Sequence, residues 1–121
     1  MFQKTGSVNE KLQAILNIEL SSGAGFDCLL DTGFQGTLVV PLKFAEDNSL
    51  PITGRETFLG AESNSIEFDT AIAEINWLGD QFLLPVLVSE STEALIGVEM
   101  MVDTILEIDY INSTVKITKP K

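Results

Sequence analysis

The decisive stretch of the sequence is residues 29–36, which read Leu-Leu-Asp-Thr-Gly-Phe-Gln-Gly. The apolar pair Leu29-Leu30 should end a strand that enters the core, and a polar, glycine-containing turn begins at Asp31. A carboxylate at such a place is a candidate for chemistry, because burial and hydrogen bonding change how readily an acid ionises. The triplet Asp31-Thr32-Gly33 is weak evidence by itself, since a chain of this length contains it by chance on the order of a few per cent of the time.

Alternating apolar and polar residues surround this turn, with the period of half-buried strands. Residues 12–20 predict the first long strand, and the turn 21–25 joins it to residues 26–30 as a hairpin. Further strand-like segments are expected at 37–40, 56–59, 66–77, 81–88, 95–97, 105–110 and 115–118. Many short strands joined by turns predict an all-β fold, a small closed or half-closed barrel in one domain that spans residues 1–121.

One or two short helices should interrupt the strands. Pro41 is expected to open a single helical turn over residues 42–46, and a second short helix is expected over 98–102. Met100-Met101 in that second helix could line a binding surface, but methionine on a short helix more often fills the core, and we adopt the core interpretation.

Composition excludes several classes of function. The 121 residues carry 18 acidic and seven basic side chains, a formal charge of −11, which argues against nucleic acid and anionic lipid as partners. The N-terminal residues contain no apolar signal region, and no apolar run is long enough to span a membrane. With a single cysteine, no intrachain disulfide can form, so we expect a cytoplasmic protein.

The absence of histidine restricts the available chemistry further. It removes the Ser-His and Cys-His nucleophile pairs and the imidazole zinc sites, so acid and base catalysis falls mainly to carboxylates. Cys28 has no histidine to activate it, and its strand position beside Phe26 and Leu30 indicates a buried structural thiol. The acidic pairs Glu67 with Asp69 and Glu107 with Asp109 lack the spacing of a calcium loop and are interpreted as solvated strand faces.

A second short motif, Leu95-Ile96-Gly97, makes a chance occurrence of Asp31-Thr32-Gly33 less probable. Leu95-Ile96-Gly97 follows Asp31 by 66 residues and precedes the expected helix, and a hairpin with a polar tip lies between the two motifs. This order resembles the retropepsin-like aspartic proteases, and the continuation Val98-Glu99-Met100-Met101 followed by residues 106–110 resembles their small bacterial single-domain members. The resemblance covers about residues 12–117 and implies an all-β, retropepsin-like acid-protease half-barrel.

The resemblance implies an aspartic endopeptidase that works as a homodimer on an extended peptide or protein substrate. The chain has one Asp-Thr-Gly, whereas this chemistry needs two facing carboxylates, so Asp31 of each of two subunits would supply one. Two close carboxylates share one proton, and the pair can activate a water between them. No metal and no organic cofactor is required.

The resemblance also implies roles for the neighbouring residues. Thr32 would hydrogen-bond across the dimer, and Gly33 would offer its backbone N–H to the carboxylate and leave room for substrate. Leu95, Ile96 and Gly97 would support the loop from beneath, where a side chain at Gly97 would obstruct close backbone approach. The hairpin over 60–66 would close over the substrate, and the expected substrate-binding residues are Phe34, Gly60, Ala61, Glu62 and Ser63.

Several departures from the family pattern matter. Phe34 stands where pepsin-like relatives usually carry Ser or Thr, so we expect activity that extends toward neutral pH. Asn64 stands where close relatives often carry glycine, and Val98 replaces the arginine of retroviral members. The C-terminal hairpin over 105–118 leaves the route of dimerisation open.

Two alternatives remain open at this stage. The chain could be an inactive retropepsin-like domain that serves as a dimerisation or peptide-binding module, although such a module has no physical need for Asp31. It could also be an unrelated small β-barrel that binds a ligand or forms part of a complex, in which Asp31 is a solvated turn residue and the two motifs coincide by chance.

Overall fold

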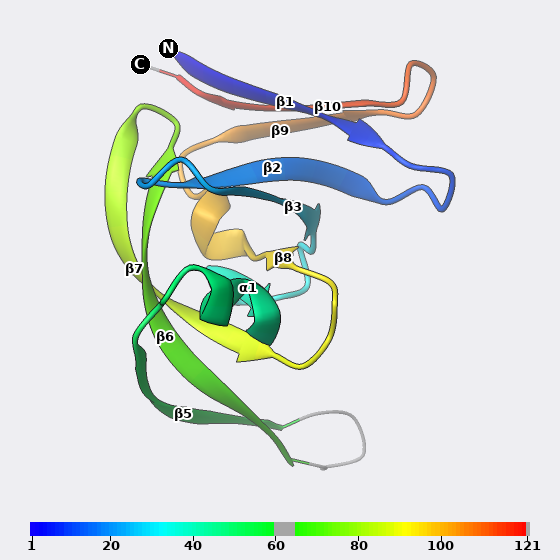
Figure 1. The fold of residues 1–121 in the computed structure, drawn as a ribbon. Helices are drawn as coiled ribbons and strands as arrows, with labels where there is room; N and C mark the ends of the chain where they lie inside the picture. Colours follow the sequence, from blue (N-terminus) through cyan, green and yellow to red (C-terminus); the bar gives the residue numbers. More distant parts are fainter. Residues whose placement is uncertain (60–64, 121) are drawn as a thin grey trace.

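The computed structural model describes residues 1–59 and 65–120 (Figure 1). Ten strands in this part of the chain form one sheet, with the order β5-β6-β7-β4-β8-β3-β2-β1-β10-β9. The strands are β1 (Phe2–Val8), β2 (Ala14–Leu20), β3 (Gly25–Leu30), β4 (Leu38–Pro41), β5 (Ile52–Leu59), β6 (Ser65–Trp77), β7 (Asp80–Ser89), β8 (Leu95–Ile96), β9 (Ile105–Asp109) and β10 (Thr114–Lys119). The predicted all-β fold is confirmed.

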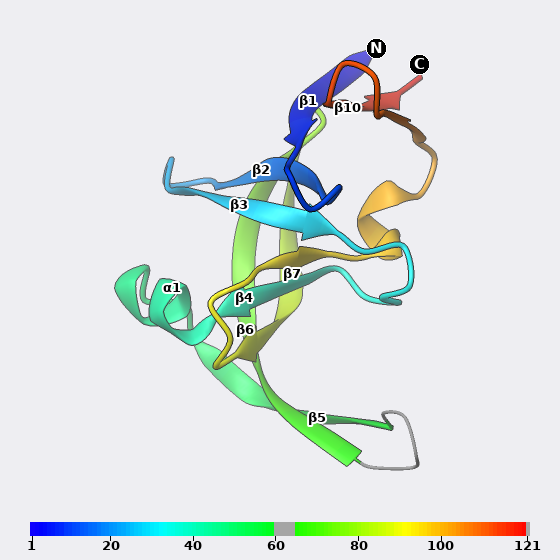
Figure 2. The ribbon, with the colours of Figure 1, turned by 90° about the vertical axis from the view of Figure 1, so that its right-hand side faces the viewer.

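The sheet closes on itself into a barrel. An additional antiparallel pairing joins β2 to β6, with Glu19 opposite Asn76 and Leu20 opposite Ile75, so the six strands from β6 through β2 in the sheet order form a closed ring. Two extensions leave this ring: β5 pairs with the long strand β6, and β1, β10 and β9 continue outward from β2. Figure 2 shows the β5–β6 hairpin projecting on one side of the barrel and the terminal strands on the opposite side.

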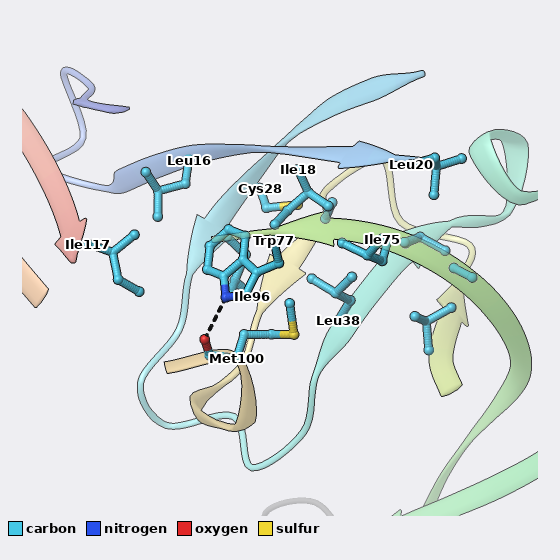
Figure 3. Packing of buried hydrophobic residues seen from close by; sticks show 14 of the residues in the cluster. Leu16, Ile18, Leu20, Cys28, Leu38, Ile75, Trp77, Ile96, Met100 and Ile117 are labelled. Carbon is cyan, nitrogen blue, oxygen red and sulfur yellow. Dashed lines mark hydrogen bonds between the residues drawn. The ribbon is translucent and has the colours of Figure 1, made fainter. Parts of the chain in front are cut away.

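The core lies inside the ring and follows the predicted alternation. In β2, the side chains of Ala14, Leu16, Ile18 and Leu20 point inward, and every second residue between them is at least partly exposed. Residues from other strands meet them there (Figure 3). The largest fully buried side chains include Leu38, Ile75, Ile96 and Ile117. Each buried leucine or isoleucine contributes about 1.5–3 kcal/mol to stability, which fixes the strands that carry the site.

Two short helices are present in the described residues, as expected. The helix α1 covers Leu42–Asp47, and the 3-10 helix η2 covers Val98–Met101. Met100 is buried, and the indole N–H of Trp77 donates a hydrogen bond of 2.9 Å to its carbonyl oxygen (Figure 3). The core interpretation of Met100 is therefore confirmed. Neither helix is long and apolar enough to cross a membrane, nor is any other helix in the described part of the chain.

The strand predicted over residues 12–20 is present as β2, but it begins at Ala14 and is not the first strand. β1 precedes that segment and pairs with both β2 and β10. At Gly6 the backbone of β2 comes so close that a Cβ atom would lie 1.9 Å from the carbonyl oxygen of Ile15. Leu12 belongs to the turn before β2, where its φ of 62° reverses the chain and leaves the side chain exposed.

Candidate active site

The loop that follows β3 holds the Asp31 carboxylate in a defined orientation. The backbone N–H of Asp31 donates to the carbonyl of Ile96 at 3.0 Å, and the N–H of Phe34 donates to the carbonyl of Asp31 at 3.1 Å. The N–H of Gly33 donates to Oδ1 of the Asp31 side chain at 3.0 Å. The carboxylate is therefore aimed by its own turn, through the glycine two residues later.

The strand β8 lies directly beneath this loop. It runs parallel to β3, with Leu29 opposite Leu95 and Leu30 opposite Ile96. After β8 the chain passes under the loop and donates three further backbone hydrogen bonds to it, from Gly97 to Thr37, from Val98 to Phe34 and from Glu99 to Gly36, at 2.8, 3.0 and 3.1 Å. These bonds fix the second half of the loop, from Phe34 to Thr37, from below.

Gly97 permits this close crossing. A Cβ atom built on Gly97 would lie 2.1 Å from the carbonyl oxygen of Gly36 and 2.7 Å from the ring of Phe34. The half-buried Phe34 ring thus packs over both glycines. Backbone cannot move aside as the end of a flexible side chain can, so only glycine fits at position 97.

The top of the loop faces solvent. Asp31 is partly buried, whereas Thr32 and Gly33 are exposed. Within the described part of the chain, the hydrogen bond from Gly33 is the one that reaches the Asp31 carboxylate, and no cation pairs with it. One protomer therefore presents one oriented carboxylate at its surface.

A hollow lies on the side of the loop that faces the β5–β6 hairpin. Its wall is partly apolar, with the Phe34 ring, Pro85 and Val86, and two glutamates also line it, Glu56 from β5 and Glu99 from η2. None of its described lining residues is a cation. Sequence reasoning did not identify Glu56 and Glu99 as neighbours, because 43 residues separate them and only the folded barrel brings them to one hollow.

A second hollow lies on the opposite side of the loop, and Asp31 and Thr32 are part of its lining. Its other lining residues are largely apolar: Leu12, Gln13, Ala14, Leu29, Leu30, Leu95, Ile108 and Tyr110. The Asp31 carboxylate therefore lines the apolar hollow, whereas the acidic hollow begins at Phe34, further along the same loop.

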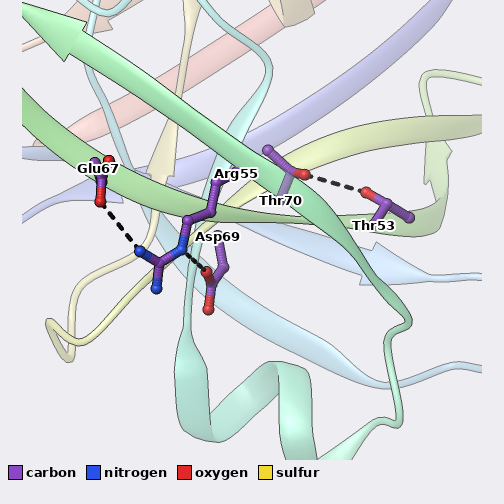
Figure 4. Close-up of polar contacts among 5 residues, drawn as sticks. All are labelled: Thr53, Arg55, Glu67, Asp69 and Thr70. Atoms are coloured by element: carbon purple, nitrogen blue, oxygen red, sulfur yellow. Dashed lines mark hydrogen bonds and ion pairs between the residues drawn. The ribbon is translucent and has the colours of Figure 1, made fainter.

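The β5–β6 hairpin carries a cross-strand ion cluster (Figure 4). Arg55 donates from Nε to Asp69 and from Nη1 to Glu67, both at 3.1 Å, and these side chains are largely solvated. Thr53 and Thr70 share a hydrogen bond of 3.1 Å nearby. Glu67 and Asp69 thus form a solvated strand face, as interpreted from the sequence. Their pairing with Arg55 could have been predicted from the register of the hairpin, which places Arg55 opposite Asp69.

The structure brings one group of the predicted site residues together. Asp31, Thr32, Gly33 and Phe34 form one loop, and Leu95, Ile96 and Gly97 lie beneath it. The other predicted substrate-binding residues, Gly60, Ala61, Glu62 and Ser63, lie outside the described residues.

The pKa values of two titratable groups, Cys28 and Asp109, differ from their ordinary values. Burial raises the pKa of the Cys28 thiol far above its usual range, and the neighbouring Asp27 carboxylate adds to this effect. Hydrogen bonds from Asn112 and Ile111 lower the pKa of Asp109. Cys28 is thus inert, as predicted from the sequence.

Among the described residues, no group of three or more His, Cys, Asp or Glu side chains is placed to hold a metal ion.

Comparison with solved structures identifies similar folds. A retropepsin-like aspartic protease from Rickettsia conorii matches with a TM-score of 0.67 and 15% identity, over 95% of this chain and 92% of that chain. The protease of simian foamy virus (mac) matches with a TM-score of 0.53 and 17% identity, over 72% of this chain and 90% of that chain.

A third match is the foamy viral protease-reverse transcriptase in complex with an RNA/DNA hybrid, with a TM-score of 0.54 and 15% identity, over 74% of this chain and 11% of that chain. No protein-family model and no curated protein matches the sequence. The structural matches confirm the expected resemblance at the level of the fold, which is the retropepsin-like fold.

Proposed function

We propose that this chain is an aspartic endopeptidase whose active form is a homodimer, with Asp31 of each subunit forming the catalytic pair. The observation that carries this proposal is the Asp31 carboxylate, which the Gly33 N–H orients at the exposed top of a loop in a retropepsin-like fold. The backbone crossing at Gly97 also holds this loop from beneath, as the resemblance implies for a catalytic carboxylate.

The chemistry follows from two carboxylates that share one proton. The ionised carboxylate accepts a proton from a water molecule, whose oxygen bonds to the carbonyl carbon of the peptide, while the protonated carboxyl donates its proton to the carbonyl oxygen. The tetrahedral intermediate then collapses as the C–N bond breaks. The leaving nitrogen takes a proton from one carboxyl, the intermediate returns a proton to the other, and the pair regains its single shared proton.

The remaining loop residues position this pair. Thr32, exposed at the top of the loop, would bond across the dimer, and Gly33 keeps the carboxylate oriented. Leu95, Ile96 and Gly97 hold the loop from beneath through backbone bonds and close packing. We assign no step to a metal or cofactor.

The substrate is an extended peptide that passes between the loop and the β5–β6 hairpin, where Phe34 and residues 60–63 would contact it. The hollow lined by Glu56 and Glu99 would then receive one substrate side chain, and its carboxylates favour a basic one. The formal charge of −11 acts in the same direction, because it repels acidic peptides.

Matched peptides test this preference. A peptide with Lys or Arg at one position should be cleaved faster than the same peptide with Glu there, and the difference should shrink in Glu56→Gln and Glu99→Gln variants and at high salt. Equal rates for both peptides at low salt would contradict the preference without affecting the proposed reaction.

The reaction itself is tested by replacing the carboxylate. Asp31→Asn should lower peptide cleavage by about 10²-fold or more, because it removes the group that accepts the proton from water. Asp27→Asn is the matched control, since Asp27 lies on β3, the strand that leads into the loop, and its exposed side chain bonds only to Asn17 in the described residues. If wild type cleaves no peptide of a diverse library while remaining folded and dimeric, the chain is the inactive dimerisation or peptide-binding module instead.

A further inference from the structure

We propose that two turns beside the Asp31 loop form the surface on which a second copy of this chain docks. The first turn presents Leu12, and the second presents Tyr110 and Ile111; these three side chains are called the turn patch. The inference rests on the proposed function, because it specifies how the second carboxylate reaches the site.

Symmetry limits where such a surface can lie. In a two-fold dimer, a residue meets its own copy only if it lies near the symmetry axis. A shared pair of Asp31 side chains therefore requires that the surface immediately around Asp31 is buried between the subunits. The residues around Asp31 on the side away from the acidic hollow are those that line the apolar hollow, including Leu12 and Tyr110.

The turn patch is unusually apolar for residues in contact with solvent. The exposed fractions of Leu12, Tyr110 and Ile111 are 68%, 59% and 94%. Turn tips commonly carry small polar residues, so large apolar side chains here indicate a surface that another molecule covers. Tyrosine in particular is enriched at protein interfaces, where its ring supplies contact area and its hydroxyl remains able to bond.

The first turn is held rigidly by Asn9. Oδ1 of Asn9 accepts hydrogen bonds from the backbone N–H groups of Lys11 and Gln13, each at 3.0 Å, and its amide donates to Oε1 of Gln13 at 2.9 Å. Within this frame Leu12 adopts a left-handed φ of 62°, a conformation that is uncommon for a leucine. Its side chain is thus held out into solvent by a structured turn.

The second turn is held by Asp109 in a similar way. Its Oδ1 accepts from the backbone N–H groups of Ile111 and Asn112 at 2.8 and 3.0 Å, and its Oδ2 accepts from the Asn112 amide at 2.8 Å. The N–H of Val8 donates to the carbonyl of Ser113 at 3.0 Å, which ties this turn to the strand that leads into the first turn. Figure 1 shows both turns on the right-hand side of the molecule. The turn patch is therefore one preformed surface.

A second copy fits this surface better than another kind of partner. The turn patch itself carries no charge, whereas each whole chain carries −11, so two copies repel at long range and must be held together by an uncharged contact. Salt screens that repulsion and leaves apolar contact intact, so dimerisation should strengthen as salt is added.

Sedimentation equilibrium on three chains tests the inference. Wild type should show a concentration-dependent mass that approaches about 26 kDa, twice the 13.2 kDa of one chain. A double variant, Leu12→Asn with Ile111→Ser, should dissociate at least about tenfold more readily, because it removes apolar contact area. Asparagine accepts a left-handed φ, so the first turn should fold as before.

Leu83→Ser is the matched control. Leu83 is 70% exposed on β7 and lines neither hollow beside Asp31, so its removal should leave the dimer as in wild type. Circular dichroism of all three chains verifies that they are folded. Cleavage by the double variant should also recover toward the wild-type rate per chain as its concentration rises, a result that a damaged active site would not give.

The outcomes separate this inference from the proposed function. A double variant that dimerises as tightly as wild type would overturn the turn patch as the interface and leave the dimeric protease intact. A wild-type chain that stays at 13.2 kDa at every concentration and salt would overturn both.

Discussion

At the scale of single residues, the site depends on glycines as much as on Asp31. Gly33 supplies the hydrogen bond that aims the carboxylate, and Gly97 allows the chain to cross beneath the loop. Gly33 acts through its backbone N–H, and Gly97 acts because it has no side chain. A side chain elsewhere in the protein could perform neither role. The two glycines and the acid are therefore one unit, although 64 residues separate Gly33 from Gly97.

Gly97→Ala should destabilise the fold and the loop together. The added methyl group would lie 2.1 Å from the Gly36 carbonyl oxygen, and relieving this overlap should cost about 1–3 kcal/mol or more of unfolding free energy. Urea unfolding measures the effect. Gly54→Ala is the control, because its added methyl group would meet Thr70 at an ordinary 3.6 Å. Equal stabilities of the two variants would show that the crossing is looser than described.

Cys28 should be unreactive in the folded protein. Burial raises the pKa of its thiol, so almost no thiolate exists at pH 8 to attack a disulfide reagent. Labelling should therefore proceed only at the rate of unfolding, and should become fast in urea. Rapid labelling of native protein, comparable to that of an exposed Ser91→Cys reference in a Cys28→Ser background, would contradict the buried position.

Asp109 should contribute to stability in a pH-dependent way. Its pKa is lowered in the folded state, so its stabilising contribution is present above the ordinary carboxyl pKa of 3.8 and is lost as pH falls through the lower folded value. Asp109→Asn should thus be less stable than wild type at pH 7 and approach it at about pH 3. Urea unfolding at both pH values measures the difference, and a gap that widens toward acid pH would contradict the sign.

At the scale of elements, the β5–β6 hairpin combines a long paired ladder with a solvated ion cluster. Arg55 should matter for local rather than global stability, because exposed ion pairs contribute only about 0–1 kcal/mol. Arg55→Gln should speed amide hydrogen exchange in β5 while unfolding of the whole chain changes little. Lys43→Gln, which breaks the exposed pair with Asp47 in α1, is the control and should leave β5 exchange unchanged.

Sequence alone predicted the elements whose burial follows a regular period. β2 was found because one face is apolar and the other polar, and β3 because an apolar run follows a glycine-containing turn. β1 was overlooked because Gly6, in its middle, gives no side-chain signal and is required only by the approach of β2. Leu12 was placed in the strand because its apolarity matched the period, but its φ belongs to a turn. Local patterns cannot reveal a requirement that a distant strand imposes.

The sequence predicted one part of the candidate site, the Asp31 loop and its support, but not the acidic residues of the neighbouring hollow. The Asp31 loop and its support at Gly97 followed from two short motifs. Glu56 and Glu99 had no local signal, because exposed glutamates on a strand and a short helix are common and only the closed barrel gathers them at one hollow.

At the scale of the whole molecule, the fold presents the Asp31 carboxylate, half of the proposed catalytic pair, beside two different surfaces. The acidic hollow and the hairpin lie on one side of Asp31, and the turn patch lies on the other. The proposed substrate and the proposed second subunit would therefore contact different residues beside the same carboxylate. The central claim is that neither subunit is active alone.

Subunit mixing tests this claim most directly. Wild type and Asp31→Asn chains, unfolded together in equal amounts and refolded, should pair at random, so only about one quarter of the dimers carry two intact carboxylates. If the site is shared, cleavage should fall to about one quarter of the wild-type rate at the same total chain concentration. A rate of about one half would show that each chain acts on its own, and would contradict the account.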